Sequence, residues 1–311
     1  MEFLKALLVS PFLDMAGSPL FTAEVVLGGL LTGVMYSLVA LGFVLIFKAS
    51  GVFNFAQGSM VLFAALTLVG LLERGVPIWA ALAATLVVMV ALAWLIERFM
   101  LRPLVNQPDI SLFMATIGLS FLLEGTGEWL WGSNVKRLDV GIPDKSFKLA
   151  GMLVNQFDLF AAGIAAVLVA VLAVFFQRTR VGRALRAVAD DHQAALSVGI
   201  PLKTIWVIVW SVAGAVALVA GIMWGAKSGV QFSLSLIALK ALPVLILGGL
   251  TSVPGAIVGG LIIGVGEKLG EVFWGPLVGG AIENWFAYML ALAFLLFRPQ
   301  GLFGERIIER V

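Results

Sequence analysis

The sequence TRVGRALRAVADDHQAALSVGIPLKT, residues 179–204, is the longest strongly polar segment between the apolar stretches of this chain. Its pattern predicts a short helix that ends at Gly199, because glycine is favoured just past a helix end and Pro201 cannot continue the helix. A capped helix between two apolar spans is typical of a docking element. The alternative is a connector that lies on anionic lipid through its basic residues. Those residues are Arg180, Arg183, Arg186 and Lys203.

The composition of the chain indicates an integral membrane protein. Of its 311 residues, 61% are hydrophobic and 12% are charged, whereas soluble domains are about a quarter charged. A net charge of +2 gives no reason to expect a nucleic-acid partner. Cysteine is absent, which excludes disulfides and thiolate chemistry. The single histidine, His192, has no second ligand near it in the sequence, so neither a metal site nor a cofactor is expected in this chain.

The apolar stretches of the sequence predict the number of membrane crossings. A helix needs about 20 residues to cross the hydrocarbon core. We therefore predict an all-α integral membrane protein, with residues 1–311 as a single transmembrane domain and about eight or nine transmembrane helices, some of them broken. Residues 3–16 are too short for a clear crossing and predict an N-terminal interfacial helix. The predicted crossings are Val25–Phe47, Ser59–Leu72, Val76–Ile96, Ile110–Trp131, Leu159–Phe176, Ile205–Ala226, Leu234–Leu250, Pro254–Gly270 and Leu277–Phe297.

Lysine and arginine in the short loops predict the orientation, because these residues accumulate on the cytoplasmic side. The loops with Lys48, with Arg98 and Arg102, and with residues 178–203, together with the C-terminal segment, are richer in basic residues than the opposite set. We therefore expect residues 179–204 and the C-terminus in the cytoplasm. The N-terminus and the 132–156 loop are expected outside, and the turn-forming residues of that loop predict a solvated segment.

Two glycine-rich interruptions break the apolar pattern: KASGVFNFAQG, residues 48–58, and LGGLTSVPGAIVGG, residues 247–260. Non-helical backbone at membrane depth must be buried in protein or line a polar cavity. Broken segments at corresponding positions of two halves point to a transport pathway. The alternative is a plain hairpin turn whose glycines allow close helix packing. In the first interruption, the side-chain amides of Asn54 and Gln57 beside two phenylalanines favour a functional loop.

Polar and charged residues inside the predicted spans are further candidates, because burying them in a membrane is costly. Thr116 and Ser120 share a helix face, where they either line the pathway or bond back to their own helix. Lys240 lies about 9 Å into its span and either lines the pathway or extends its side chain outward. Glu124 and Glu128 lie near the outer end of theirs, either as solvated interfacial carboxylates or at the mouth of the pathway.

No soluble catalytic or nucleotide-binding domain fits in the chain. The longest stretches outside the spans have about 25 residues, too few to build a core of their own. The sequence has no G-x-x-x-x-G-K-[ST] loop to hold phosphates, and nothing beside the paired acids supplies a nucleophile, a metal or an oxyanion donor. We therefore expect a protein that is not an enzyme. If ATP drives it, other chains hydrolyse the ATP.

Four motifs in a fixed order carry a resemblance to a known family: SGVFNFAQG, ALRAVADD with AALSVGI, LGGLTSVPGAIVGG and FRPQGLFG. Together they resemble the membrane permeases of branched-chain amino acid ABC importers, in particular the shorter, LivH-like type, over roughly residues 25–304. The resemblance implies an all-helical permease of the bacterial inner membrane that imports a small amphipathic solute such as a branched-chain amino acid. It implies as partners a second, homologous permease chain, two cytoplasmic subunits that bind ATP and magnesium, and a periplasmic solute-binding protein.

The resemblance also implies roles for particular residues. The helix of residues 183–200 would couple to the ATPase through Arg186, Asp190, Asp191, Ala195, Gly199 and Ile200. The candidate pathway residues are Asn54, Gln57, Ser59, Thr116, Ser120 and Lys240. Many relatives carry NFAHGE where this chain has NFAQGS, so the sequence predicts the loss of a charge at Ser59.

Two other kinds of function stay open from the sequence. One is a secondary transporter or channel subunit for a small polar solute, which should carry a coupling site for protons or sodium within the spans. The other is import of urea, amides or aromatic acids by the same ABC architecture.

Overall fold

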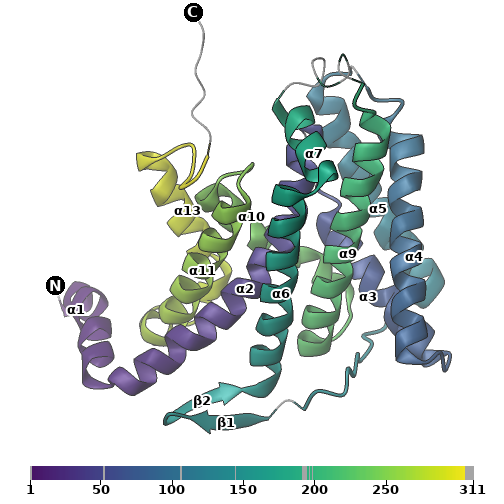
Figure 1. Ribbon diagram of the computed structural model, residues 1–311. Coiled ribbons are helices and arrows are strands. Elements are labelled where there is room, and N and C mark those ends of the chain that lie inside the picture. Colours follow the sequence, from purple (N-terminus) through teal and green to yellow (C-terminus); the bar gives the residue numbers. More distant parts are fainter. Residues whose placement is uncertain are drawn as a thin grey trace, which may run out of the picture. The chain divides into compact units, whose positions relative to one another are not determined.

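The computed structural model describes residues 2–51, 53–105, 107–143, 145–190, 195, 197 and 199–304. These residues are mostly helical (Figure 1) and fall into two compact units. The first unit contains the chain up to Ser37, Gly141–Ala166, and the chain from Lys240 onward. The second unit contains Leu38–Val140 and Val167–Leu239. Each unit is described here by itself.

The second unit is built around one deeply buried helix. Helix α3 (Gln57–Glu73) is buried from Gln57 to Gly70 and packs against α9 (Leu202–Ser228) and α5 (Asp109–Trp131). Small residues allow the close approach: a Cβ at Gly221 of α9 would lie 2.7 Å from the Val61 carbonyl oxygen. Helix α4 (Ile78–Ile96) packs on α9 and continues as a π-helical turn, η1 (Glu97–Leu101). The C-terminal part of α2 (Pro19–Ser50) and of α6 (Gln156–Arg178), helix α7 (Arg180–Asp190) and the 3-10 turn η2 (Phe232–Leu236) complete the unit.

The first unit is held by a glycine contact between α2 and α11 (Val253–Leu269). A Cβ at Gly33 would lie 2.6 Å from the Gly260 carbonyl oxygen, and one at Gly29 would lie 2.8 Å from the Gly264 carbonyl oxygen. Glycine at four-residue spacing on both helices therefore lets the two backbones touch. The unit also contains α1 (Glu2–Gly17), most of α10 (Ile237–Gly248), π-helical η3 (Gly270–Trp274), α12 (Gly275–Val278), 3-10 helix η4 (Ile282–Asn284) and α13 (Phe286–Phe297).

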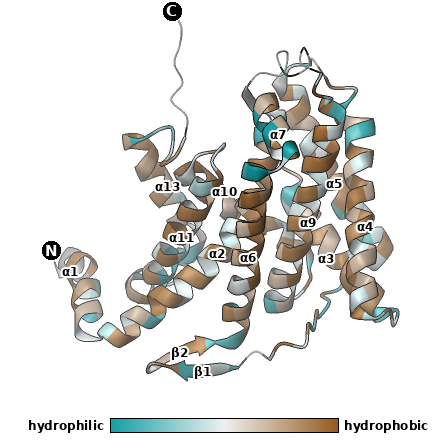
Figure 2. Ribbon diagram, viewed as in Figure 1, coloured by the Kyte–Doolittle hydropathy of each residue, from teal (hydrophilic) through white to brown (hydrophobic). Residues whose placement is uncertain are grey.

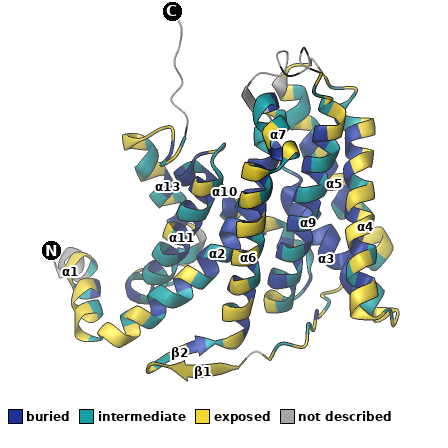
Figure 3. Cartoon of the chain, viewed as in Figure 1, coloured by how far each residue is buried: buried dark blue, intermediate teal, exposed yellow. Residues whose placement is uncertain are grey.

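Five helices among the described residues are long and apolar enough to cross a membrane. They are α2, α4 continued to Leu101, α5 from Ile110, α6 and α9. A sixth crossing is counted if Phe232–Gly248 and Val253–Val278, which meet at 115°, form one broken span. Helix α4 is hydrophobic in Figure 2 and largely exposed in Figure 3, with Trp79 80% and Val87 67% exposed. An apolar face left uncovered in this way is what a lipid-facing helix presents.

Two details differ from the sequence prediction. The expected span Leu277–Phe297 is not continuous: α12 ends at Val278, and the chain adopts positive φ at Gly279, Gly280 and Ala281 before α13 begins. The 132–156 loop also contains a hairpin that was not predicted, in which β1 (Ser146–Leu149) pairs antiparallel with β2 (Met152–Asn155). Ala150 and Gly151 join the strands with φ of 52° and 88°, the left-handed pair that a two-residue hairpin needs.

Candidate functional site

Helix α3 starts deep inside the second unit and not at the level where α5 starts. Ser59, in its first turn, contacts Ser120, which lies eleven residues after the start of α5 at Asp109. At 1.5 Å per residue, the start of α3 is therefore about 16 Å along α5. The irregular backbone before α3 is buried, with Asn54 and Ala56 both 0% exposed. This is the arrangement in which a membrane protein tolerates non-helical backbone within its spans.

Side chains replace the missing helical hydrogen bonds of this segment. The Oδ1 of Asn54 accepts from the Ala56 backbone N–H at 3.1 Å, and the Gln57 N–H donates to the Asn54 carbonyl at 3.2 Å. The Thr116 hydroxyl accepts from the Phe55 N–H at 3.2 Å and lies 2.8 Å from the carbonyl of Phe113, one turn earlier in α5. Asn54 and Thr116, both pathway candidates, are thus the residues that hold the turn in shape.

An aromatic wall borders the same segment. Phe43 of α2 stacks on Phe53 with ring centroids 4.7 Å apart, Phe53 meets Phe55 edge to face at 4.9 Å, and Phe55 meets Phe113 of α5 at 4.9 Å. The wall provides an apolar surface beside the polar residues. Apolar lining with a few placed polar groups is the usual composition of a small-molecule site.

Gln57 is the unexplained polar group of this region. Its side chain is 0% exposed, and neither its amide nitrogen nor its amide oxygen has a hydrogen-bond partner. The amide lies against Gly42 of α2, where a Cβ would come within 2.8 Å of the Gln57 Cδ. A buried polar group without a partner costs about 1–3 kcal/mol. A residue that keeps this cost is a candidate for a partner acquired during function.

Ser59 and Ser120 come together with a carboxylate. Their hydroxyl oxygens are 2.7 Å apart, and the Ser59 hydroxyl also donates to Oε1 of Glu124 at 2.8 Å. Ser59 itself is uncharged, and Glu124 places a carboxylate beside it from α5. The two acids also differ from each other: Glu128 is exposed, whereas Glu124 is half-buried against α3.

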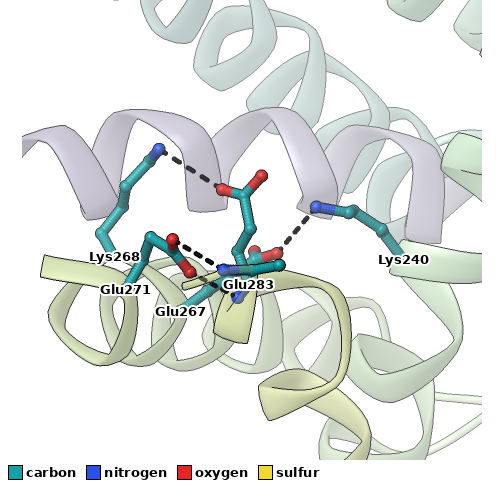
Figure 4. A network of polar contacts seen from close by, with 6 residues as sticks. Lys240, Glu267, Lys268, Glu271 and Glu283 are labelled. Atoms are coloured by element: carbon teal, nitrogen blue, oxygen red, sulfur yellow. Dashed lines mark hydrogen bonds and ion pairs between the residues drawn. The ribbon is translucent and has the colours of Figure 1, made fainter. Parts of the chain in front are cut away.

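Lys240 lies in the first unit and is described with the residues of that unit. Its ammonium forms a 2.9 Å ion pair with Glu267 of α11, which is 3% exposed and also accepts from the Tyr36 hydroxyl. Figure 4 shows Lys240 and Glu267 pointing toward each other across the bend between α10 and α11. Lys240, half-buried, is thus paired with a buried carboxylate, because a charge at this depth needs a partner.

The other charged residues labelled in Figure 4, Lys268, Glu271 and Glu283, form ion pairs and hydrogen bonds within the first unit. Lys268 lies 3.9 Å from Glu283, and both carboxylate oxygens of Glu271 accept backbone N–H groups, at 3.1 Å from Ala281 and 3.0 Å from Glu283. Glu271 thereby provides acceptors for backbone N–H groups at the point where the last predicted span is broken. These contacts are structural and add no further candidate to the pathway.

Helix α7 contains part of the predicted coupling segment. Thr179 caps its start by accepting from the Gly182 N–H at 3.0 Å, and Leu185 and Val188 are buried. Arg186 donates to the Phe176 carbonyl at 2.7 Å, so it caps the end of α6 and fixes the angle between α6 and α7.

The end of the coupling segment has the predicted helix-stop geometry. Gly199 has φ of 82°, and the Ile200 N–H donates to the Ala195 carbonyl at 3.0 Å, which is the hydrogen bond of a Schellman cap with Gly199 at C′. Ala195 is buried. The predicted coupling residue Asp191 lies outside the described residues, and Asp190 is described only as the last residue of α7.

The second glycine-rich interruption pairs with the C-terminal motif. The Leu302 N–H donates to the Leu247 carbonyl at 2.8 Å, and the Phe303 N–H donates to the Gly248 carbonyl at 3.1 Å. The sequences LGG and FRPQGLFG therefore form one structural element in the first unit. Ser252 caps α11 by accepting from the Gly255 N–H at 3.0 Å. In this arrangement the interruption joins α10 and α11 at a bend of 115°.

The comparisons with known proteins establish the family. The sequence profile of the family described as branched-chain amino acid transport system/permease component matches residues 25–298, and the chain belongs to this family. The chain is 30% identical over 299 residues to the high-affinity branched-chain amino acid transport system permease protein BraD of Pseudomonas aeruginosa, covering 91% of this chain and 96% of BraD. It is 28% identical over 313 residues to the corresponding permease protein LivH of Escherichia coli, covering 94% and 98%.

An archaeal protein is similar over nearly the same length. The chain is 30% identical over 295 residues to the probable branched-chain amino acid transport permease protein LivH of Methanocaldococcus jannaschii, covering 89% of this chain and 91% of that one. The family and the apolar helices together define a multi-pass inner-membrane transport permease.

Proposed function

We propose that the chain is the membrane-spanning permease subunit of an ATP-driven ABC importer, and that it translocates a small amphipathic solute such as a branched-chain amino acid. The observation that carries the proposal is the buried, interrupted start of α3. It combines an aromatic wall with the amides of Asn54 and Gln57 and the hydroxyls of Ser59, Thr116 and Ser120. That the similar proteins BraD and LivH belong to branched-chain amino acid transport systems supports the class of solute.

The proposal extends to topology and partners. The chain crosses the membrane about eight or nine times, counting the shorter and broken helices that a bundle can shield from lipid. Its N-terminus lies outside and its C-terminus in the cytoplasm, in line with the distribution of lysine and arginine. Its partners are a second, homologous permease chain, two cytoplasmic ATPase subunits that hold ATP and magnesium, and a periplasmic binding protein. The chain itself needs no cofactor.

Helix α7 and the segment up to Ile200 couple the permease to its ATPase. The capped start at Thr179, the Arg186 contact to the end of α6 and the hydrogen bond from Ile200 to Ala195 support a helix held at a fixed angle. A fixed angle is required to transmit a displacement from one chain to another. Lys240 remains a pathway candidate, supported by its half-buried position and by the ion pair with the buried Glu267.

The proposal is tested by reconstituting the complex in proteoliposomes. The chain is co-purified with its proposed permease and ATPase partner subunits, and uptake of radiolabelled L-leucine is measured with ATP inside and the binding protein outside. We expect uptake only when both are present. Uptake that continues without ATP and follows an imposed proton or sodium gradient would assign the chain to secondary transport instead.

A further inference from the structure

Three oxygen-bearing side chains converge between α3 and α5, and the hydrogen-bond directions among them can be assigned. A carboxylate can only accept, so the Ser59 hydroxyl donates its one proton to Glu124. The 2.7 Å contact between Ser59 and Ser120 therefore requires Ser120 to be the donor. The result is a chain of donors directed at the carboxylate. Ser59, Ser120 and Glu124 are called the oxygen cluster below.

Among the described residues, none supplies a positive charge that pairs with the carboxylate of Glu124. The ion pairs formed there join other residues, and no cation lies within salt-bridge distance of Glu124. Glu124 is seven residues before the end of α5 at Trp131, about 10 Å along the helix axis. A carboxylate at that depth that is held by the Ser59 hydroxyl is costly, and it is stabilised when a cation reaches it.

The geometry points to one use of this cluster: we propose that it receives the ammonium group of the solute as the solute passes through the permease. A primary ammonium has three donors, which match the second carboxylate oxygen of Glu124 and the free lone pairs of the two hydroxyls. Phe113 and Thr116 lie on the same face of α5 toward its start, so the apolar part of the solute meets the aromatic wall while its ammonium is held. This inference rests on the proposed transport function.

An alkali-metal cation has the same chemistry toward three oxygens, so the experiment must separate the two. Uptake of L-leucine by the reconstituted wild-type complex is measured in sodium medium and in choline medium. We expect equal uptake in the two media, because the solute supplies its own cation. Uptake that requires sodium would overturn the assignment to the ammonium in favour of a bound metal ion.

The decisive variant removes the charge of Glu124 and keeps the shape of its side chain. In Glu124→Gln, the amide oxygen still accepts from Ser59, so packing is retained while the negative charge is lost. We expect leucine uptake to fall at least tenfold with unchanged amounts of assembled complex. Glu128→Gln is the matched control, since Glu128 lies one turn further along α5 and is exposed, and it should transport like the wild type.

A variant in which the carboxylate is moved from α5 to α3 tests whether uptake depends on the charge or on the local structure around Glu124. In Ser59→Glu/Glu124→Ser, the acid moves to α3, and its oxygens reach the place that the Glu124 carboxylate occupies. We expect this double variant to recover most of the uptake lost in Glu124→Gln. Wild-type uptake by Glu124→Gln, or a double variant that is no better than Glu124→Gln at equal assembly, would overturn the proposal. A wild-type complex that takes up no leucine at all would show instead that the proposed function fails.

Discussion

The hydroxyl of Ser59, in the first turn of α3, donates a 2.8 Å hydrogen bond to Oε1 of Glu124, which lies four helical turns along α5. This contact fixes the level at which α3 begins and places a carboxylate beside an interrupted backbone. In a membrane, such backbone is tolerated only where protein or a polar route covers it. The contact therefore joins the interrupted backbone before α3 to the polar cluster of Ser59, Ser120 and Glu124.

Asn54 and Gln57 should respond differently to replacement by leucine, although both are buried amides. Asn54→Leu removes the acceptor of the Ala56 N–H, so we expect the complex to lose about 1–3 kcal/mol of stability and also to transport several-fold more slowly. Gln57→Leu removes a group that has no partner, so we expect unchanged or slightly raised thermal stability with a several-fold loss of uptake. Thermal unfolding of the purified complex and leucine uptake check both.

The opposite pattern would contradict this division of roles. If Gln57→Leu destabilised the complex as much as Asn54→Leu, the amide of Gln57 would be part of the packing. If Gln57→Leu transported at the wild-type rate, the amide would have no part in the pathway.

Lys240 and Glu267 should be more sensitive to single than to double replacement. Lys240 is half-buried and Glu267 is buried, so removing the lysine leaves the Glu267 charge uncompensated, at a cost of up to about 3–5 kcal/mol, whereas a pair replaced by uncharged side chains of similar volume is often neutral. We therefore expect Lys240→Met to unfold at a clearly lower temperature than the wild type, and Lys240→Met/Glu267→Gln to recover most of the loss. Lys268→Met, at an ion pair whose side chains are about 40% exposed, is the control and should change little. A double variant as unstable as the single one would refute the ion-pair account.

Gly199 should matter for coupling and not for insertion. Its φ of 82° is costly for a residue with a branched Cβ, so Gly199→Val strains the cap by about 1 kcal/mol or more. We expect normal membrane insertion and a reduced stimulation of ATP hydrolysis by the loaded binding protein. Ala195→Asp, which places a charge at a buried position of the same segment, should act in the same direction.

The control for this substitution is Gly163→Val in α6, where an added Cβ meets no atom within 4 Å. It tests the effect of a branched residue without a left-handed backbone. Full stimulation of ATP hydrolysis in both Gly199→Val and Ala195→Asp would show that this segment does not couple to the ATPase.

The topology can be tested by single-cysteine labelling, which has no background because the chain contains no cysteine. Arg183 of α7 and Lys148 of β1 are both exposed. We expect an impermeant thiol reagent applied to intact cells to label Lys148→Cys and to spare Arg183→Cys until the cells are opened. Labelling of Arg183→Cys from outside would invert the proposed orientation.

Local features of this fold could be predicted from the sequence, and long-range pairings could not. The position of Gly199 as a helix stop follows from short-range backbone chemistry, and the structure has the matching φ and hydrogen bond. The most apolar spans were predicted because twenty apolar residues leave few alternatives. By contrast, Glu267 lies 27 residues from Lys240, and no sequence spacing indicates that they pair.

The candidate site shows the same limit. The spacing of Thr116, Ser120 and Glu124 at every fourth residue is a signal in the sequence for one polar helix face. That this face meets Ser59 depends on how far α3 is displaced along α5, which is a property of tertiary packing. The break at Gly279 and Gly280 also had a signal, a glycine pair, which was outweighed by the apolar residues on either side.

The most direct test of the account asks whether the start of α3 becomes accessible during transport. Ala56 in the interrupted segment and Ala93 of α4 are both 0% exposed, so Ala56→Cys and Ala93→Cys form a matched pair. The measurement is the rate at which a small impermeant thiol reagent modifies each cysteine in the assembled complex, at rest and during ATP turnover with loaded binding protein. If the segment lines the translocation route, Ala56→Cys reacts many-fold faster during turnover and loses uptake on modification, while Ala93→Cys stays unreactive. Equal, slow modification of both cysteines under turnover would contradict the central claim.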